Sequence, residues 1–231
     1  MSKRLFFILT IILLILTFSI RGFGLLSSPP SLYWEEVAIG YDAYAIIKTG
    51  HDHHGHAWPI LAFESFGDWK PALYFYLVAG AELILGLTPL AVRLPALLSG
   101  LAMVIAVAWL IKYLLEDHLS SENIRLLMVI TLLVGGLSPW GVMFSRAGWE
   151  SMVAASLLAW GGLGWVYAGK AKHKMLVLIL STLLLALSAY TYHAARLIAP
   201  LLFVWLLINF VLPKKITYAH MVARVKSNIW P

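Results

Sequence analysis

The sequence predicts an all-α integral membrane protein: a multi-pass helical bundle with about six spans and a further membrane-associated helix in its first exterior loop. Composition is the first observation, since 61% of the 231 residues are hydrophobic, only 12% are charged, and the mean hydropathy is +0.85. Such values lie far outside the usage of soluble globular proteins. The second observation is a series of apolar stretches, most of them close to the roughly 20 residues that a spanning helix needs.

The first apolar stretch, residues 5–20, is predicted to be an uncleaved anchor helix within residues 1–21. Lys3 and Arg4 precede it, Arg21 closes it, and no small-x-small cleavage motif follows, which argues against a signal peptide. The basic residues before it favour a cytoplasmic N-terminus in the cell membrane. The absence of cysteine excludes disulfides and thiolate metal sites.

The positive charge of the chain does not indicate a nucleic-acid partner. Although the sequence pI is about 9.5, the basic residues sit in short loops between apolar stretches and do not form one contiguous face. The positive-inside rule of membrane proteins accounts for them better. We therefore expect the lipid bilayer as a partner and no nucleic acid.

Among the later apolar stretches, one is doubtful as a span. Residues 71–87 are short and interrupted by Glu82 and Gly86, whereas the others occupy residues 90–111, 124–144, 152–168, 175–190 and 197–212. If residues 71–87 cross the membrane, every later loop changes side and the basic residues divide 5 inside to 12 outside. If they do not cross, 11 lie inside: Lys3, Arg4, Lys112, Arg125, Lys170, Lys172, Lys174, Lys214, Lys215, Arg224 and Lys226. The positive-inside rule favours the second topology, with an embedded or interfacial helix at residues 71–87.

This topology gives the chain a long exterior loop at residues 22–92, five further spans at residues 93–213 and a cytoplasmic segment at residues 214–231. Within the loop, Pro29-Pro30-Ser31 reads as a breaker followed by a helix N-cap, and Lys48-Thr49-Gly50 as a helix end. A short helix from about Trp34 to Lys48 is therefore expected. The loop also holds most of the acidic residues of the chain: Glu35, Glu36, Asp42, Asp52, Glu64, Asp68 and Glu82.

Several motifs in order along the chain resemble one family. They are the acidic pair Glu35-Glu36, then GYDAYAIIKTG, FGDWKPALYFYL, AVRLPALLSG, FSRAGWE and YTYHAAR. This succession resembles the N-terminal half of the GT-C membrane glycosyltransferases, near the lipid-carrier-dependent branch related to protein mannosyltransferases and the aminoarabinose transferase of lipid A. The resemblance implies an all-helical bundle whose first exterior loop carries the catalytic acid.

The resemblance also implies roles for particular residues. The family's catalytic Asp-Glu pair falls on Glu35 and Glu36, so both are expected to be catalytic. Glu35 is the candidate base, with glutamate in place of the usual aspartate. The family's lysine before proline falls on Lys70 and its arginine at the start of the next helix on Arg93, and both would hold a lipid phosphate.

Four further residues complete the expected substrate site. Asp68 belongs to the motif around Lys70. Arg146 and Glu150 lie on a short exterior turn, and His193 lies at an exterior helix end. The implied reaction is an inverting transfer of a monosaccharide from a polyprenyl-phosphate carrier to an acceptor hydroxyl on the exoplasmic face. The acceptor, whether protein, lipid or glycan, is not indicated, and no cofactor is required, although the resemblance leaves room for a divalent cation.

Each of these residues also has a purely structural interpretation. First-turn acids favour a helix through its dipole whether or not they react. Lys70 and Arg93 could be interfacial anchors whose charged ends reach toward water. Arg146 and Glu150 could form an ion pair at the start of a helix. His193 could belong to the belt of polar aromatic residues at a membrane interface. The run from His51 to His56 suits a transition metal by residue type, but adjacent loop histidines lack a fixed geometry, so no metal site is predicted there.

Two other classes of protein remain open. In a transporter or channel subunit, Glu35, Glu36, Glu82 and Glu150 would serve as ion or proton ligands, as intramembrane acids often do. The acids cluster in one exterior loop, however, and no inverted repeat is present. In a non-catalytic scaffold, replacing the motif residues would change no activity. The chain stops earlier than members of the family usually do, so we expect it to be the N-terminal part of a longer protein.

Overall fold

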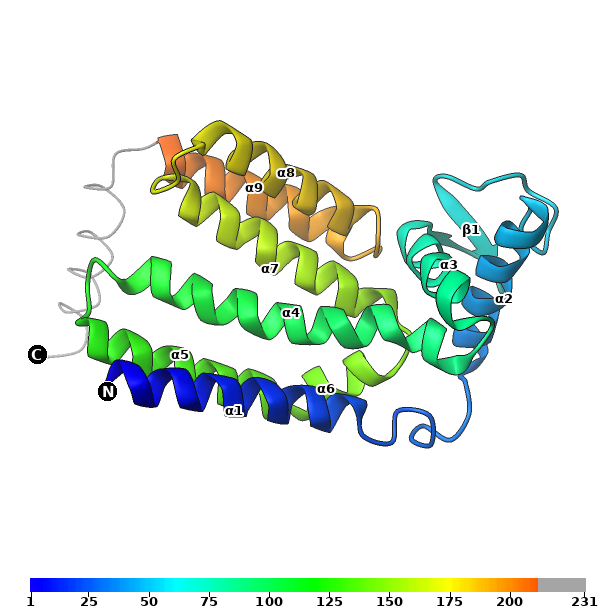
Figure 1. Cartoon of the computed structure of the whole chain (residues 1–231). Coiled ribbons are helices and arrows are strands. Elements are labelled where there is room, and N and C mark those ends of the chain that lie inside the picture. The colour runs from blue at the N-terminus through cyan, green and yellow to red at the C-terminus, as the bar shows by residue number, and fades with distance from the viewer. Residues whose placement is uncertain (212–231) are drawn as a thin grey trace, which may run out of the picture.

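The computed structural model describes residues 1–211, and within them six helices lie side by side as a bundle (Figure 1). They are α1 (Lys3–Gly22), α4 (Pro89–Leu115), α5 (Ser121–Leu137), α7 (Glu150–Ala168), α8 (Lys174–Ala189) and α9 (Ala195–Val211). The N-terminus and the α4–α5 and α7–α8 connections lie at one end of the bundle, and the segment between α1 and α4 lies at the other. The predicted cytoplasmic segment, residues 214–231, and the last residues of the predicted final span lie outside the described residues.

Length and apolar composition identify three to four candidate membrane spans among residues 1–211. Helices α1, α4 and α7 qualify alone, and α5 qualifies together with α6 (Pro139–Arg146) as one bent pair. The apolar helices α3 (Leu73–Leu85), α8 and α9 are shorter than 18 residues. The chain is therefore a helical protein with the features of a membrane protein, and the described residues yield fewer clear spans than the six expected.

The stretch predicted to be one span over residues 124–144 is broken. Helix α5 ends at Leu137, and α6 begins at Pro139 after a bend of 54°. Pro139 lacks a backbone N–H and is tolerated at the first helical position, while the Ser138 side chain accepts a bond from the backbone N of Gly141 at 3.4 Å. The Ser-Pro pair thus starts a second helix where apolar composition alone suggested continuity.

Arg21, near the end of α1, bonds to the carboxyl end of α5. Its side chain is fully buried and donates to the carbonyls of Gly136 at 2.5 Å and Gly135 at 3.1 Å. The last carbonyls of a helix have no partner within the helix and carry partial negative charge, so a cation is favoured there. Arg21 therefore holds α1 against α5.

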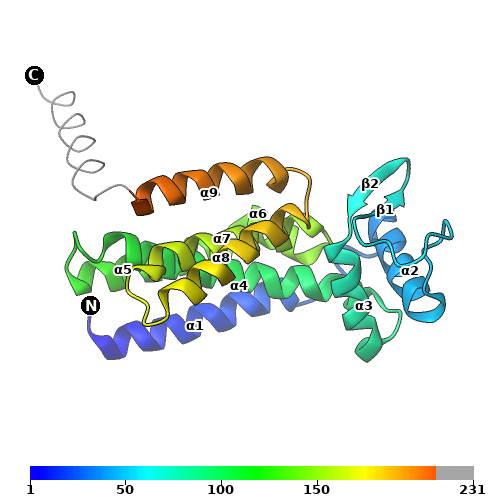
Figure 2. The ribbon, with the colours of Figure 1, turned by 90° about the horizontal axis from the view of Figure 1, so that it is seen from above.

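Beyond the bundle, α2 (Trp34–Thr49), a β-hairpin and α3 form a unit at one end (Figure 2). The hairpin pairs β1 (Ala62–Ser65) with β2 (Asp68–Pro71), and Phe63 faces Lys70 in the register. Phe66 and Gly67 form its turn with φ of 53° and 75°, the left-handed conformation that two-residue hairpin loops require. The described residues form a mainly α-helical fold as expected, and these two short strands were not predicted.

Helix α2 confirms the predicted helix and corrects its cap. Its bounds, Trp34–Thr49, match the expected 34–48, and it ends at Gly50 with φ of 74°. The residue before its first turn is Tyr33, not Ser31, and the backbone N of Tyr33 donates to Glu36 Oε2 at 2.8 Å. An N3 carboxylate that reaches back to the N-cap backbone is one half of a capping box.

The terminal unit shares one apolar core with the bundle. Phe63 of β1 stacks on Phe75 of α3 with ring centroids 4.2 Å apart. The same buried cluster includes Ile39 of α2, Val92 of α4 and Val153 of α7. This continuity fixes α2 and the hairpin against the ends of α4 and α7, where most of the predicted site residues lie.

Candidate functional site

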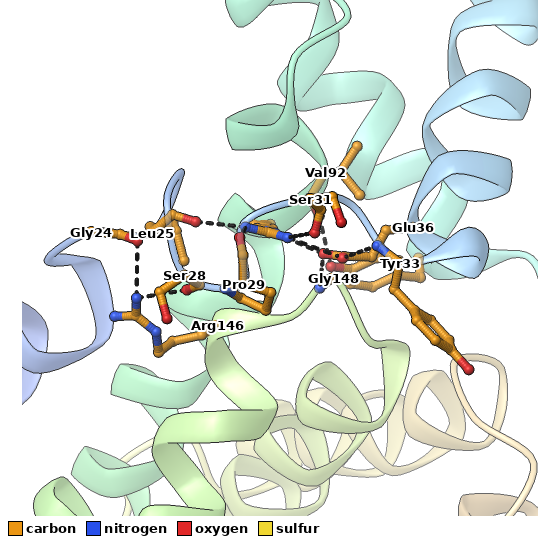
Figure 3. A network of polar contacts seen from close by, with 12 residues as sticks. Gly24, Leu25, Ser28, Pro29, Ser31, Tyr33, Glu36, Val92, Arg146 and Gly148 are labelled. Carbon is orange, nitrogen blue, oxygen red and sulfur yellow. Dashed lines mark hydrogen bonds and ion pairs between the residues drawn. The ribbon is translucent and has the colours of Figure 1, made fainter.

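Glu36 is completely buried, and protein donors occupy its whole carboxylate (Figure 3). Oε1 accepts from Arg93 Nε and from the backbone N of Gly148, each at 2.8 Å. Oε2 accepts from the backbone N of Tyr33 at 2.8 Å and from Arg93 Nη2 at 3.2 Å. Two carboxylate oxygens offer about four acceptor positions, so this group has no capacity left for a substrate.

Arg93 is just as fully engaged. Besides the two bonds to Glu36, Nη1 donates to the carbonyls of Leu25 at 2.6 Å and Pro29 at 3.2 Å, and Nη2 donates to that of Ser31 at 2.8 Å. A guanidinium has five N–H donors, and five bonds use them all. The pair ties the chain after α1 to α2, α4 and the turn before α7.

The electrostatics agree with a permanent ion pair. Burial raises the pKa of the Glu36 carboxyl, but the hydrogen bonds from Arg93, Tyr33 and Gly148 outweigh burial, and the pKa is lowered. The carboxylate is therefore charged at neutral pH. A buried pair of this kind is costly to break, because the remaining charge would lack compensation.

Gly148 completes this pocket and was not among the predicted site residues. A Cβ at this position would lie 2.9 Å from Val92 Cγ1 and 3.1 Å from the Val92 carbonyl oxygen. Only a residue without a side chain lets the backbone N–H approach Glu36 so closely. The glycine between Arg146 and Glu150 in the motif was the available sequence signal.

Glu35, Lys70 and Glu150 come together on the open side of the same region. Lys70 Nζ lies 2.7 Å from Glu35 Oε1 and 4.0 Å from Glu150 Oε1. The three residues come from α2, β2 and α7, which the shared core holds together. The Glu35 side chain is 32% exposed, whereas those of Lys70 and Glu150 are 9% and 13% exposed. The cluster thus combines one accessible carboxylate with a lysine that is mostly shielded from solvent.

Lys70 is protonated in this setting. Burial lowers its pKa, but the hydrogen bond to Glu35 and the negative charges of Glu150, Glu35 and Asp68 raise the pKa by more. The Lys70 ammonium thus lies within 4.0 Å of two carboxyl groups, those of Glu35 and Glu150. Asp68 is exposed, and its carboxylate accepts from the backbone N of Trp69.

His193 approaches this cluster from the α8–α9 connection. Its Nε2 lies 3.0 Å from the carbonyl oxygen of Trp69, the residue before Lys70. The ring is exposed. His193 therefore joins the far side of the bundle to the hairpin, at the edge of the cluster and without a direct bond to Glu35 or Lys70.

Arg146 holds the chain that leaves α1 (Figure 3). Its Nη1 donates to the carbonyls of Ile20, Arg21 and Phe23, and its Nη2 to those of Gly24 and Ser28, at 2.7 to 3.1 Å. The ion pair with Glu150, which was the structural alternative to a substrate role, is not among the ion pairs of the described residues. Arg146 caps α1 as Arg21 caps α5.

The histidine run forms a short loop between α2 and the hairpin. His53 Nδ1 lies 2.7 Å from Asp42 Oδ1, and His56 Nδ1 lies 2.9 Å from Asp52 Oδ2. As the side chains stand, no group of three His, Asp or Glu residues within residues 1–211 converges as a ready metal site.

No family model, curated protein or solved structure matches the chain. The fold and the site therefore define a class only: a helical protein with candidate membrane spans that carries a carboxylate and lysine cluster at one end of its bundle.

Proposed function

We propose that the chain is a membrane glycosyltransferase of the GT-C type, which transfers a monosaccharide from a polyprenyl-phosphate carrier to an acceptor hydroxyl. The observation that carries the proposal is the Glu35–Lys70–Glu150 cluster at the end of an apolar bundle. A lipid-linked sugar phosphate has an apolar tail, an anionic phosphate and a reactive anomeric carbon. The apolar bundle would contact the tail, Lys70 would bind the phosphate, and Glu35 would act at the anomeric carbon by activating the acceptor hydroxyl.

The proposed reaction uses Glu35 as a general base. When the phosphate enters, Lys70 exchanges its bond to Glu35 for one to a phosphate oxygen, which frees the carboxylate. Glu35 then takes the proton of the acceptor hydroxyl while that oxygen bonds to the anomeric carbon. The bond from the anomeric carbon to the phosphate oxygen breaks with inversion, and the leaving phosphate keeps the electron pair. General-base assistance of this kind is typically worth 10² to 10⁴ in rate.

Lys70 is proposed to stabilise the departing phosphate. A fixed cation in a poorly solvated site stabilises developing negative charge more strongly than water does. Glu150, 4.0 Å from Nζ, keeps the ammonium charged and oriented. No step of this scheme requires a metal ion.

Arg93, Glu36 and Arg146 receive different roles from those first expected. All five donors of Arg93 are used within the protein, as are all four acceptor positions of Glu36. We therefore assign these residues to holding α2 and the α6–α7 turn around the cluster. Asp68 and His193 stay at the rim of the cluster, where they are accessible to a substrate.

The proposed topology has six spans with the cluster on the exoplasmic side of the cell membrane. Helices α8 and α9 run alongside α7 (Figure 1), which supports counting them as spans despite their lengths of 16 and 17 residues. Helix α3 lies with the terminal unit, which supports an interfacial position. The eleven acidic residues are divided unevenly between the two ends of the bundle. The end with the N-terminus holds only Glu116, Asp117 and Glu122. That end is richer in net positive charge, as expected for the cytoplasmic face.

Donor binding tests the proposal directly. The purified chain in lipid nanodiscs is titrated with polyprenyl-phosphate sugars. We expect saturable binding that Lys70→Ala weakens about tenfold or more, because a charge-assisted bond to phosphate is lost. Glu35→Gln should bind donor as well as wild type and fail in sugar transfer.

Lys48→Ala is the matched control, since Lys48 is an exposed lysine at the end of α2. It should leave donor binding unchanged. Absence of donor binding by the folded wild-type chain, or equal losses in Lys70→Ala and Lys48→Ala, would overturn the proposal.

A transporter is the second candidate, and Glu82 is the observation that favours it. This α3 carboxyl is buried, and neither of its oxygens has a hydrogen-bond partner within the described residues. Such a group could carry a proton or bind a cation in transit. Proton or cation flux in proteoliposomes that is lost in Glu82→Gln, without donor binding by wild type, would favour this function.

A further inference from the structure

The loop of residues 51–56 holds its histidines in a defined orientation. Three of the four imidazoles use Nδ1 for a local contact: His51 with the Thr49 carbonyl at 2.9 Å, His53 with Asp42 Oδ1 at 2.7 Å and His56 with Asp52 Oδ2 at 2.9 Å. When Nδ1–H donates to an oxygen, the neutral ring presents the lone pair of Nε2 outward.

The two aspartates also fix the backbone of this loop. Asp42 Oδ1 accepts from the backbone N of His53 at 2.9 Å. Asp52 Oδ1 accepts from the backbone N of His54 at 3.0 Å and of His56 at 2.8 Å. Both aspartate side chains are 0% exposed. The defined geometry that sequence reasoning found lacking is therefore supplied by buried carboxylates.

The ring of His54 is close enough to each of its two neighbours to share an ion with it. Zinc–nitrogen bonds are about 2 Å long, so two imidazoles on one ion have ring centroids within about 6.5 Å of each other. The centroids of His53 and His54 are 3.9 Å apart, and those of His54 and His56 are 6.1 Å apart. The side chains of His53 and His56 are 34% and 47% exposed, so an ion can reach them from solvent.

We propose that this loop binds a divalent transition-metal ion of the zinc class through Nε2 of His53, His54 and His56, with water completing the coordination. The donors do not yet converge. The ring of His54 makes no hydrogen bond among the described residues and is the one that turns toward the ion. A histidine ligand whose other ring nitrogen is bonded to a carboxylate is the usual arrangement around protein-bound zinc. The site shares no residue with the Glu35–Lys70–Glu150 cluster and does not depend on the transferase proposal, although the His56 ring lies 5.8 Å from that of Trp69, the neighbour of Lys70.

Zinc affinity is measured by competition with a chromophoric chelator, using the full chain in nanodiscs without a histidine tag. We expect one site per chain, weakened at least tenfold by His54→Ala, which removes a ligand and no hydrogen bond of its side chain. His173→Ala, at the opposite end of the bundle, is the control and should leave the affinity unchanged. Equal affinity of His54→Ala and wild type would overturn the proposal.

The aspartates distinguish a built site from simple chelation by a histidine-rich segment. Asp42→Asn and Asp52→Asn keep every ligand, and we expect each to lower zinc affinity about 10- to 100-fold, the usual loss when the partner of a metal-bound histidine is replaced. Copper(II) bound to wild type should show nitrogen couplings from three imidazoles in its electron paramagnetic resonance spectrum. Unchanged affinity in both aspartate variants together with fewer than three nitrogen couplings would mean adventitious chelation only.

Discussion

Glu35 and Glu36 are neighbours in the first turn of α2, yet their side chains meet opposite surroundings. Glu36 accepts hydrogen bonds from four donors, whereas Glu35 is one-third exposed and, among residues 1–211, is bonded to Lys70 alone. A helix turns by about 100° per residue, so consecutive side chains point to different sides. Here Glu36 faces the core and holds neighbouring segments together, while Glu35 faces outward, where solvent can reach its carboxylate. A paired motif therefore need not share one role.

We expect the largest effect from a substitution that breaks the buried Glu36–Arg93 ion pair. Arg93→Ala leaves the Glu36 carboxylate buried without its cation, and we expect a loss of about 3–5 kcal/mol in unfolding free energy. Denaturant unfolding of the purified protein measures the loss. The double variant Glu36→Ala with Arg93→Ala should lose less than the sum of the two single variants, because the uncompensated charge is gone. Additive losses would contradict a coupled pair.

The role of the exposed acid, Glu35, is tested by Glu35→Gln. This change removes a base but not a framework contact, so transfer should fall by about 10² to 10⁴ while stability changes by less than about 1 kcal/mol, as for partly exposed ion pairs. Single-turnover transfer from a bound donor and denaturant unfolding give the two values. A variant that transfers sugar at the wild-type rate would remove Glu35 from the mechanism.

Gly148 offers a smaller test of how tightly the buried pair is packed. In Gly148→Ala the new methyl group meets Val92 at 2.9 Å and its carbonyl oxygen at 3.1 Å. We expect a loss of about 1–3 kcal/mol from overpacking and displacement of the N–H from Glu36. Gly162→Ala is the matched control, because a Cβ there meets nothing within 4 Å. Similar losses in both variants would mean that the tight contact is not the cause.

The smallest expected effect concerns pH. The folded pKa of Glu36 is lowered from its ordinary value of 4.5, so its stabilisation is complete above pH 4.5 and is lost as pH falls through the lower folded pKa. Wild type should therefore lose more stability between pH 5 and about pH 3 than Glu36→Gln. Melting temperatures across this range make the comparison.

Local sequence signals predicted local structure well. The helix of α2 was expected at nearly its observed bounds because the acids of its first turn and Gly50 at its end act within a few residues. The grouping of Lys70 with Glu35 and Glu150 was expected from the family resemblance and not from local signals, and in the structure both carboxyl groups lie within 4.0 Å of the Lys70 ammonium.

Pairings across the chain were not readable in the same way. Arg93 meets Glu36 across 57 residues, and only the packing of α4 against α2 decides that this arginine is consumed internally. The hairpin depends on pairing between two strands that are too short and too mixed in composition to give a recognisable strand pattern in the sequence. We propose structural roles for Arg93 and Arg146 for one reason: the residue type indicates a cation, and its surroundings decide what the cation binds.

The reciprocal arginine caps bear on how the chain is made. Arg21 is synthesised 115 residues before its partner Gly136, and Arg146 bonds to carbonyls at the end of α1 that were made much earlier. At a synthesis rate of about 5–20 residues per second, the interval between the two is about 6–23 s. During that time the end of α1 carries a cation whose final partners do not yet exist. That charge needs other partners, such as water or lipid headgroups, until α5 and α6 are made.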